Sequence, residues 1–132
     1  MTEATAVRVS SPSYQAYQIL HIAFTAAPIV AGVDKFYHFL TNWEMYVSPI
    51  VPRLLGVSAH SFMLGVGVIE IIAGFIVAVA PRIGGWIVGL WLCGIIVNLL
   101  MIPGYFDIAL RDFGLALGAF ALARLSVNYS AV

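Results

Sequence analysis

The chain has very little charge. Asp, Glu, Lys and Arg make up 9% of its 132 residues, whereas soluble domains usually carry about 25%. Hydrophobic residues account for 62% of the chain, and the mean hydropathy is +1.01. This composition excludes an ordinary soluble domain and indicates an integral membrane protein. Six basic and six acidic residues balance, and no basic patch suggests nucleic acid as a partner.

Cysteine and the common enzyme motifs are also scarce. The single cysteine, Cys93, lies in an apolar run, so we expect a small, inert apolar side chain without an internal disulfide. The sequence has no Cys/His metal spacing, P-loop, dinucleotide fingerprint, HExxH or GxSxG. We therefore expect no metal site and no resident cofactor, and any catalysis would occur within the membrane or beside a partner.

Long apolar segments are what the chain does contain. About 20 apolar residues suffice to cross a hydrocarbon core of about 30 Å. The sequence predicts an all-α integral membrane protein, a four-transmembrane-helix bundle over residues 14–126, after a flexible tail at residues 1–13. The expected spans are residues 14–33, 61–80, 85–102 and 106–126.

The connection between the first two spans, residues 34–60, is rich in aromatic residues. Its spacing predicts an amphipathic helix lying in the membrane interface, with Trp and Tyr at headgroup level. Such a helix could serve as an anchor, as a substrate lid, or as both. Pro49 and Pro52 would end it. The expected interfacial anchors are Phe36, Phe39, Trp43 and Tyr46.

Glu70 is the only formal charge in the second span. A carboxylate at that depth costs roughly 2.5–3.5 kcal/mol on insertion scales, so we expect it to face protein rather than lipid. Small residues mark faces where helices approach closely in a membrane. The residues that share a helical face with Glu70 are Met63, Gly67, Gly74 and Val77. Two GxxxG pairs, Gly85 with Gly89 and Gly114 with Gly118, predict further helix packing.

The other polar residues of the predicted spans gather toward the same side of the membrane. They are Lys35, Asn98, Arg111 and Asp112, with His21 in the first span as a possible addition. One interpretation is structural: Glu70 pairs with Lys35 or with Arg111 and locks the helices in register. The other is functional: the cluster forms a polar pocket or proton site, because ionisable residues within the membrane are functional candidates.

The distribution of Lys and Arg predicts the orientation in the membrane. With four spans, Arg8, Arg82 and Arg124 fall on one side, and Lys35 and Arg53 on the other. This slight bias favours cytoplasmic termini, with the aromatic loop on the outer face.

The order of several short motifs resembles the DoxX/DoxD-like family of small membrane proteins. These motifs are Gly32 and Lys35, then Glu70, Ala73 and Gly74, then the Pro81–Arg82 turn, then Arg-Asp-x-Gly-Leu-x-x-Gly-Ala over residues 111–119. The resemblance implies a four-helix bundle in a bacterial inner membrane. The family is named after subunits linked to a thiosulfate:quinone oxidoreductase and a terminal quinol oxidase. The site residues that it carries over are Lys35, Glu70, Arg111 and Asp112. The long aromatic loop and the polar first helix depart from the family pattern.

The function expected from these features is that of a small membrane subunit of a quinone-linked electron-transfer complex. It would anchor a catalytic partner and line a quinone or proton site, and it would contact membrane lipid and other subunits. Haem ligation by His21, His38 or His60 is not supported by any helix-facing histidine pair. The main alternative is a structural accessory subunit that packs on a larger respiratory or photosynthetic complex and binds lipid. A small transporter or proton pathway is less favoured, because the inner half of the bundle lacks polar groups and no inverted repeat is evident.

Overall fold

The computed structural model describes residues 9–132, and within that range it is all α, with four long helices. Most of the predicted N-terminal tail lies outside the described residues. The long helices are α2 (Pro12–Tyr37), α4 (Ala59–Val79), α5 (Pro81–Leu100) and α6 (Phe106–Leu125). The short elements are η1 (Trp43–Tyr46), α3 (Ile50–Leu55) and η2 (Ser126–Asn128).

Helices α2, α4 and α5 are each long and apolar enough to cross a membrane. Helix α6 has 20 residues but is more polar, because it carries Asp107, Arg111, Asp112 and Arg124. Large apolar side chains point outward from all four helices. Soluble proteins rarely expose so much apolar surface to water. They include Ile19 and Ile22 on α2, Ile72 and Phe75 on α4, Leu90 and Val97 on α5, and Leu110 and Leu117 on α6. The chain is therefore an integral membrane protein.

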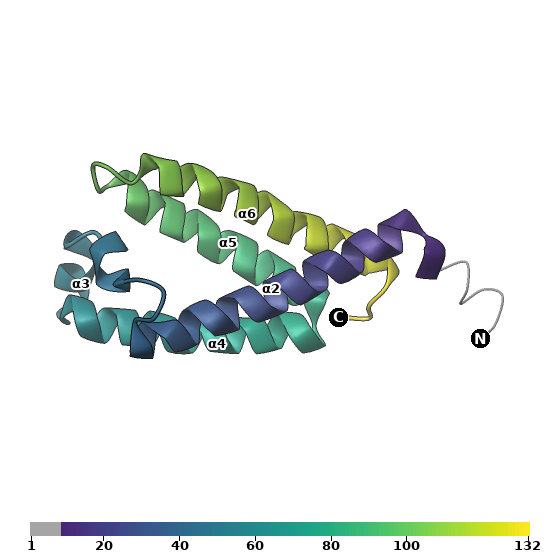
Figure 1. Ribbon diagram of the computed structural model, residues 1–132, viewed down its shortest axis with the longest axis horizontal. Helices are drawn as coiled ribbons and strands as arrows, with labels where there is room; N and C mark the ends of the chain where they lie inside the picture. Colours follow the sequence, from purple (N-terminus) through teal and green to yellow (C-terminus); the bar gives the residue numbers. More distant parts are fainter. Residues whose placement is uncertain (1–8) are drawn as a thin grey trace.

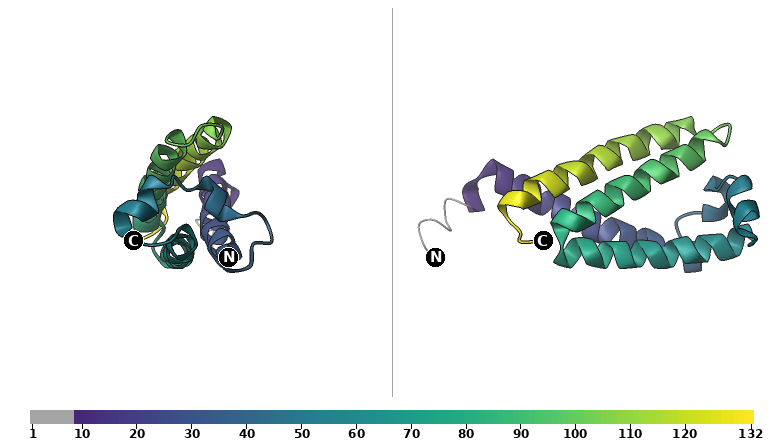
Figure 2. Two further views of the ribbon diagram at one scale, coloured as in Figure 1. Left: turned by 90° about the vertical axis from the view of Figure 1, so that its left-hand side faces the viewer. Right: turned by 180° about the vertical axis from the view of Figure 1, so that it is seen from behind.

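The four long helices form two antiparallel pairs, α2 with α4 and α5 with α6 (Figure 1). The pairs meet at the end where α4 turns into α5 and where the C-terminus lies. They separate toward the opposite end, where α3 lies, so the bundle has the shape of a wedge (Figures 1 and 2). We call these the narrow end and the wide end.

Glycines allow the backbones within each pair to approach closely. A Cβ on Gly67 of α4 would lie 2.7 Å from the carbonyl oxygen of Gly32 on α2. A Cβ on Gly85 of α5 would lie 2.9 Å from the carbonyl oxygen of Ala119 on α6, and Gly89 faces the Phe120 ring. These contacts fix which faces of the helices meet.

The second GxxxG pair packs at only one of its two glycines. Gly118 lies against the ring of Phe24 on α2, and a Cβ on Gly118 would lie 3.1 Å from the nearest ring carbon. A Cβ on Gly114 would have nothing within 4 Å. The prediction that Gly114 mediates helix packing is therefore wrong, because its face of α6 turns outward.

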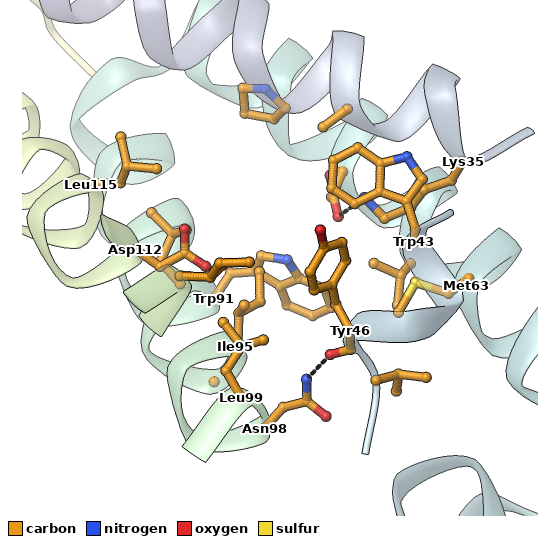
Figure 3. A pocket seen from close by; sticks show the side chains of 18 of the residues that line it. Lys35, Trp43, Tyr46, Met63, Trp91, Ile95, Asn98, Leu99, Asp112 and Leu115 are labelled. Carbon is orange, nitrogen blue, oxygen red and sulfur yellow. Dashed lines mark hydrogen bonds and ion pairs between the residues drawn. The ribbon is translucent and has the colours of Figure 1, made fainter. Parts of the chain in front are cut away.

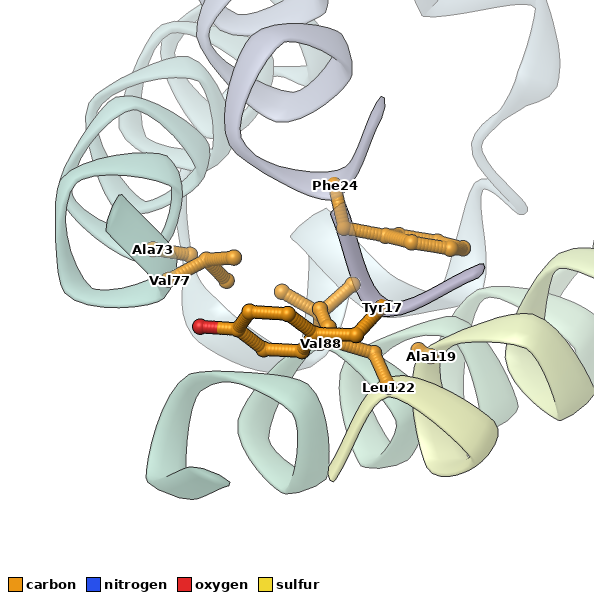
Figure 4. Close-up of a cluster of buried hydrophobic side chains, with 7 residues drawn as sticks. All are labelled: Tyr17, Phe24, Ala73, Val77, Val88, Ala119 and Leu122. Carbon is orange, nitrogen blue, oxygen red and sulfur yellow. The ribbon is translucent and has the colours of Figure 1, made fainter. Parts of the chain in front are cut away.

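A tightly packed apolar cluster holds the narrow end together (Figure 4). Val77, Ala119 and Leu122 are completely buried in it. The other members are Tyr17, Phe24, Ala73 and Val88. All four long helices contribute, so this cluster is the core that joins the two helix pairs.

The predicted amphipathic helix within residues 34–60 is not formed as one element. Helix α2 continues to Tyr37 and ends because His38 adopts a left-handed conformation, with φ of 57°. The carboxylate of Asp34 then accepts hydrogen bonds from the amides of Phe39 and Leu40, at 2.8 and 3.0 Å. Such side-chain bonds compete with helical ones. Only the short η1 and α3 follow before α4.

Helix α5 begins earlier than the sequence predicts. Residues 81–84, expected to be a turn, form its first turn, with Pro81 at the first helical position. Proline suits that position because its missing N–H has no helical partner there. The amides of Arg82 and Ile83 donate to the carbonyl oxygen of Val132, at 3.0 and 3.2 Å.

The close approach of α2 and α4 predicts a position-specific effect of alanine. Gly67→Ala should lower the free energy of unfolding by about 1–3 kcal/mol, because the new methyl group would collide with the Gly32 backbone. Gly65→Ala is the matched control in the same helix, since nothing lies within 4 Å of its Cβ position. Unfolding equilibria in mild detergent would measure both, and equal stabilities would contradict the packing.

Candidate functional site

A cavity of about 810 Å³ occupies the wide end, between the two helix pairs. Helices α2, α4, α5 and α6 and the loop around η1 all contribute to its walls. Most of its surface is apolar, from side chains such as Met63, Val66, Trp91, Ile95 and Leu115. Figure 3 shows Trp91, Ile95 and Leu115 on one side of the view and Met63 on the other. The apolar cluster of the narrow end closes the cavity on that side, since Phe24, Ala73 and Val88 belong both to the cluster and to the cavity lining.

The first polar group in the wall is a buried ion pair. Lys35 Nζ lies 2.8 Å from Oε1 of Glu70, and the two side chains are 4% and 10% exposed. The close approach of Gly67 to α2 brings these residues together, since a Cβ on Gly67 would lie 3.2 Å from Cβ of Lys35. The sequence left Lys35 and Arg111 as possible partners of Glu70, and the structure pairs Glu70 with Lys35.

Trp43 covers this ion pair from the loop side. Lys35 Nζ lies 3.9 Å from the centroid of the Trp43 ring, a favourable cation–π arrangement. The indole N–H of Trp43 donates to Oδ2 of Asp34 at 2.9 Å. Asp34, which sequence reasoning missed as a site residue, therefore ends α2 and also aims Trp43 at Lys35. The signal for it was a carboxylate next to the aromatic loop.

Asn98 on α5 fastens the loop across the mouth of the cavity. Its Nδ2 donates to the carbonyl oxygen of Tyr46 at 2.6 Å (Figure 3). Its Oδ1 accepts from the amide of Ser48 at 2.8 Å. Both groups of the side-chain amide are therefore used by the backbone of residues 46–48. Asn98 acts chiefly as a clamp on the loop.

The second charged pair comes from neighbouring residues of α6. Arg111 donates from Nε and Nη2 to Oδ1 of Asp112, at 3.1 and 3.0 Å. Successive helical residues do not face one another, so the guanidinium group bends back over the helix surface. The Arg111 side chain is 62% exposed, whereas that of Asp112 is 6% exposed. Asp112 is thus the member that faces the interior.

The structure does not bring His21 to this cluster. Its Nε2 lies 2.9 Å from the carbonyl oxygen of Val77 and 3.1 Å from that of Ala78, at the narrow end. The inclusion of His21 in the polar cluster is therefore wrong. His38 and His60 lie at the wide end with ring centroids 6.5 Å apart, and Nδ1 of His60 lies 2.6 Å from Glu44.

The four aromatic residues expected as interfacial anchors divide into two kinds. Phe36 and Phe39 are 47% and 88% exposed and remain available to the interface. Trp43 and Tyr46 instead line the cavity (Figure 3). The loop therefore supplies part of the wall, which the prediction of a surface helix did not include.

The indole N–H of Trp91 is the one buried side-chain donor without a hydrogen-bond partner among residues 9–132. The ring itself lines the cavity from α5.

Taken as a whole, the site combines a large apolar surface with two charged pairs, each of which is neutral overall. That combination suits an apolar ligand with a polar head group.

Comparisons of the chain with protein-family models, with curated proteins and with solved structures find no match. The resemblance to the DoxX/DoxD-like family therefore stays a prediction.

The Lys35–Glu70 pair predicts a strong coupling between its members. Lys35→Met should destabilise the fold by about 3–5 kcal/mol, because it leaves a buried carboxylate unpaired. The double variant Lys35→Met/Glu70→Gln should recover much of that loss, because neither position is then charged. A double-mutant cycle measured by unfolding in mild detergent would test this, and additive effects of the two substitutions would contradict the pairing.

The Asn98 clamp predicts a local effect on the loop. Asn98→Ala should speed hydrogen exchange at the Ser48 amide by roughly tenfold or more, since a lost hydrogen bond costs about 0.5–1.5 kcal/mol and an unsatisfied group more. Asn128→Ala, an exposed asparagine outside the cavity lining, is the control. Unchanged exchange at Ser48 in Asn98→Ala would show that the loop is held by other contacts.

Proposed function

We propose that this chain is a small membrane subunit of a quinone-linked electron-transfer complex, and that its cavity receives the quinone head group. The observation that carries this proposal is the cavity itself, with its apolar walls, its buried Lys35–Glu70 pair and the buried carboxylate of Asp112. Ionisable residues placed near a quinone head group can exchange protons with it. The volume of about 810 Å³ falls within the roughly 300–1,000 Å³ typical of small-molecule sites.

The shape of the cavity favours a bound ligand over a transported one. Its polar groups lie at the wide end, and the buried cluster of Val77, Ala119 and Leu122 blocks the narrow end. A transport route would need polar groups through that core. A hydrophobic tail, by contrast, needs only an apolar exit toward lipid.

In this proposal α6 is a fourth span, although it is less apolar than the others. It packs antiparallel to α5, and Arg111 and Asp112 neutralise one another. Its outward face is apolar, with Phe106, Leu110, Phe113 and Leu117 exposed. The termini would then share the cytoplasmic side of a bacterial inner membrane, and the loop would meet a partner subunit on the outer face.

One observation favours the structural alternative, an accessory subunit without a ligand. Lys35 ties α2 to α4 and Asn98 ties the loop to α5, so both have roles in holding the fold. These contacts leave the cavity unfilled by protein, however, and a purely structural role would not require such a space. A lipid acyl chain is the occupant that this alternative predicts.

A photoactivatable quinone analogue with a short isoprenoid tail would test the proposal in lipid nanodiscs. We expect labelling of cavity residues such as Met63 and Trp91, and its loss when unlabelled quinone is added in excess. Ala31→Trp, on α2 in the cavity wall, should abolish labelling by filling the space. Ala26→Trp, exposed on the same helix and outside the lining, should preserve it. Labelling confined to the outer apolar faces would contradict the proposal.

A further inference from the structure

The indole N–H of Trp91 on α5 is buried and has no hydrogen-bond partner among residues 9–132. An indole N–H can only donate, and the N–H of a buried tryptophan usually finds an acceptor. A buried polar group that stays unpaired costs free energy of folding. An acceptor supplied from outside the chain would therefore lower the free energy of this part of the molecule.

This N–H belongs to the wall of the cavity. The Trp91 ring lines the cavity from α5, and in the view of Figure 3 its nitrogen lies on the edge nearer Tyr46. The ring also borders a smaller hollow of about 370 Å³ between α4 and α5, whose other lining residues are all apolar. The acceptor for the N–H therefore has to come from the side of the main cavity.

The other donors of the cavity are in a different position. Tyr46 and Thr41 carry hydroxyl groups on half-buried loop residues. The Arg111 side chain is 62% exposed and already donates to Asp112. Donors with access to the surface can bond to water when no ligand is bound, whereas the N–H of Trp91 is buried. Trp91 is therefore the donor in this cavity that gains most from a bound acceptor.

The surroundings of the ring limit the kind of acceptor. Trp91 packs against the apolar cluster of Val47, Met63 and Val66, where a charged group would lose its hydration at a large cost. A neutral oxygen on an otherwise apolar ring, such as a quinone carbonyl oxygen, suits this position. The ligand reaches the N–H when part of the contact with Val47 gives way, and the loop that carries Val47 is held to α5 by the hydrogen bonds of Asn98.

We infer that Trp91 positions the head group of the ligand by donating a hydrogen bond from its indole N–H to a carbonyl oxygen. The ring then lies beside the bound head group, while the apolar walls hold the rest of the ligand. This inference rests on the proposed function, since it assigns a binding role to one residue of the same cavity.

Two ligands and a matched pair of variants test this inference. The ligands are a short-tailed quinone and an aromatic hydrocarbon with the same ring size and tail, which has no oxygen. Each would compete in nanodiscs with the photoactivatable analogue for labelling of Met63. Trp91→Phe should lower the ratio of quinone affinity to hydrocarbon affinity about threefold to tenfold, because only the quinone loses a hydrogen bond. Trp86→Phe, on the same helix but 47% exposed and outside the cavity lining, should leave the ratio unchanged.

An isosteric replacement separates the N–H from the shape of the ring. Trp91→benzothienylalanine keeps the two fused rings and has sulfur in place of the N–H. This variant should bind the quinone about threefold to tenfold more weakly than the unaltered protein does. Without ligand it should be at least as stable in mild detergent, because no described residue pairs with the lost N–H. It also decides the matter if Trp91→Phe does not fold.

The outcomes separate the inference from the function on which it rests. Unchanged quinone binding in the isosteric variant would overturn the inference, whatever Trp91→Phe does, and would leave the proposed function standing. A clear loss of stability in the ligand-free isosteric variant would show that the N–H has a partner within the protein, which also overturns the inference. Failure of the quinone to displace the analogue from the unaltered protein would sink both.

Discussion

The buried contact between Lys35 and Glu70 is the constraint on which the wide end of this fold depends. A charged carboxylate within a membrane must find a partner or face protein, and a lysine amine reaches one at 2.8 Å only if the backbones lie close. Gly32 and Gly67 permit that approach, since a side chain at either position would collide with the opposite helix. The small residues and the charges of α2 and α4 are therefore parts of one arrangement.

The same contact also organises the loop. Lys35 attracts the Trp43 ring, Asp34 holds the indole N–H, and Asn98 holds the backbone beyond it. The aromatic loop is consequently drawn inward over the cavity instead of lying flat in the interface. The structural role of these polar residues is compatible with the proposed binding role. One oxygen of Glu70 contacts Lys35 and so secures α2 against α4, while the residue also lines the cavity.

The sequence predicted those features that follow from periodicity within one helix. The face of α4 that carries Met63, Gly67, Glu70, Gly74 and Val77 is buried as expected, because a 3.6-residue repeat places these positions together. The sequence also limited the partners of Glu70 to two. It could not choose between them, because the choice depends on which helices pair closely, and that is a property of the whole bundle.

The errors have a common physical origin in contacts between distant parts of the chain. The loop was expected to be helical from its own spacing, but the Asp34 carboxylate competes for its amides. His21 was grouped with the polar cluster because of its chemistry, yet the direction of α2 takes it to the narrow end. Gly114 belongs to a GxxxG pair, but α6 turns that residue outward. Local pattern cannot reveal any of these outcomes.

The two ends of the wedge are stabilised by different forces, and this difference bears on function. In lipid the hydrophobic effect does not drive helices together, so close packing and polar contacts must do so. The narrow end uses close packing, with Val77, Ala119 and Leu122 fully buried. The wide end uses the ion pair, which joins α2 to α4, and the Asn98 clamp, which joins the loop to α5. If the cavity receives a quinone, as proposed, the ligand would enter and leave at the wide end without disturbing the packed core.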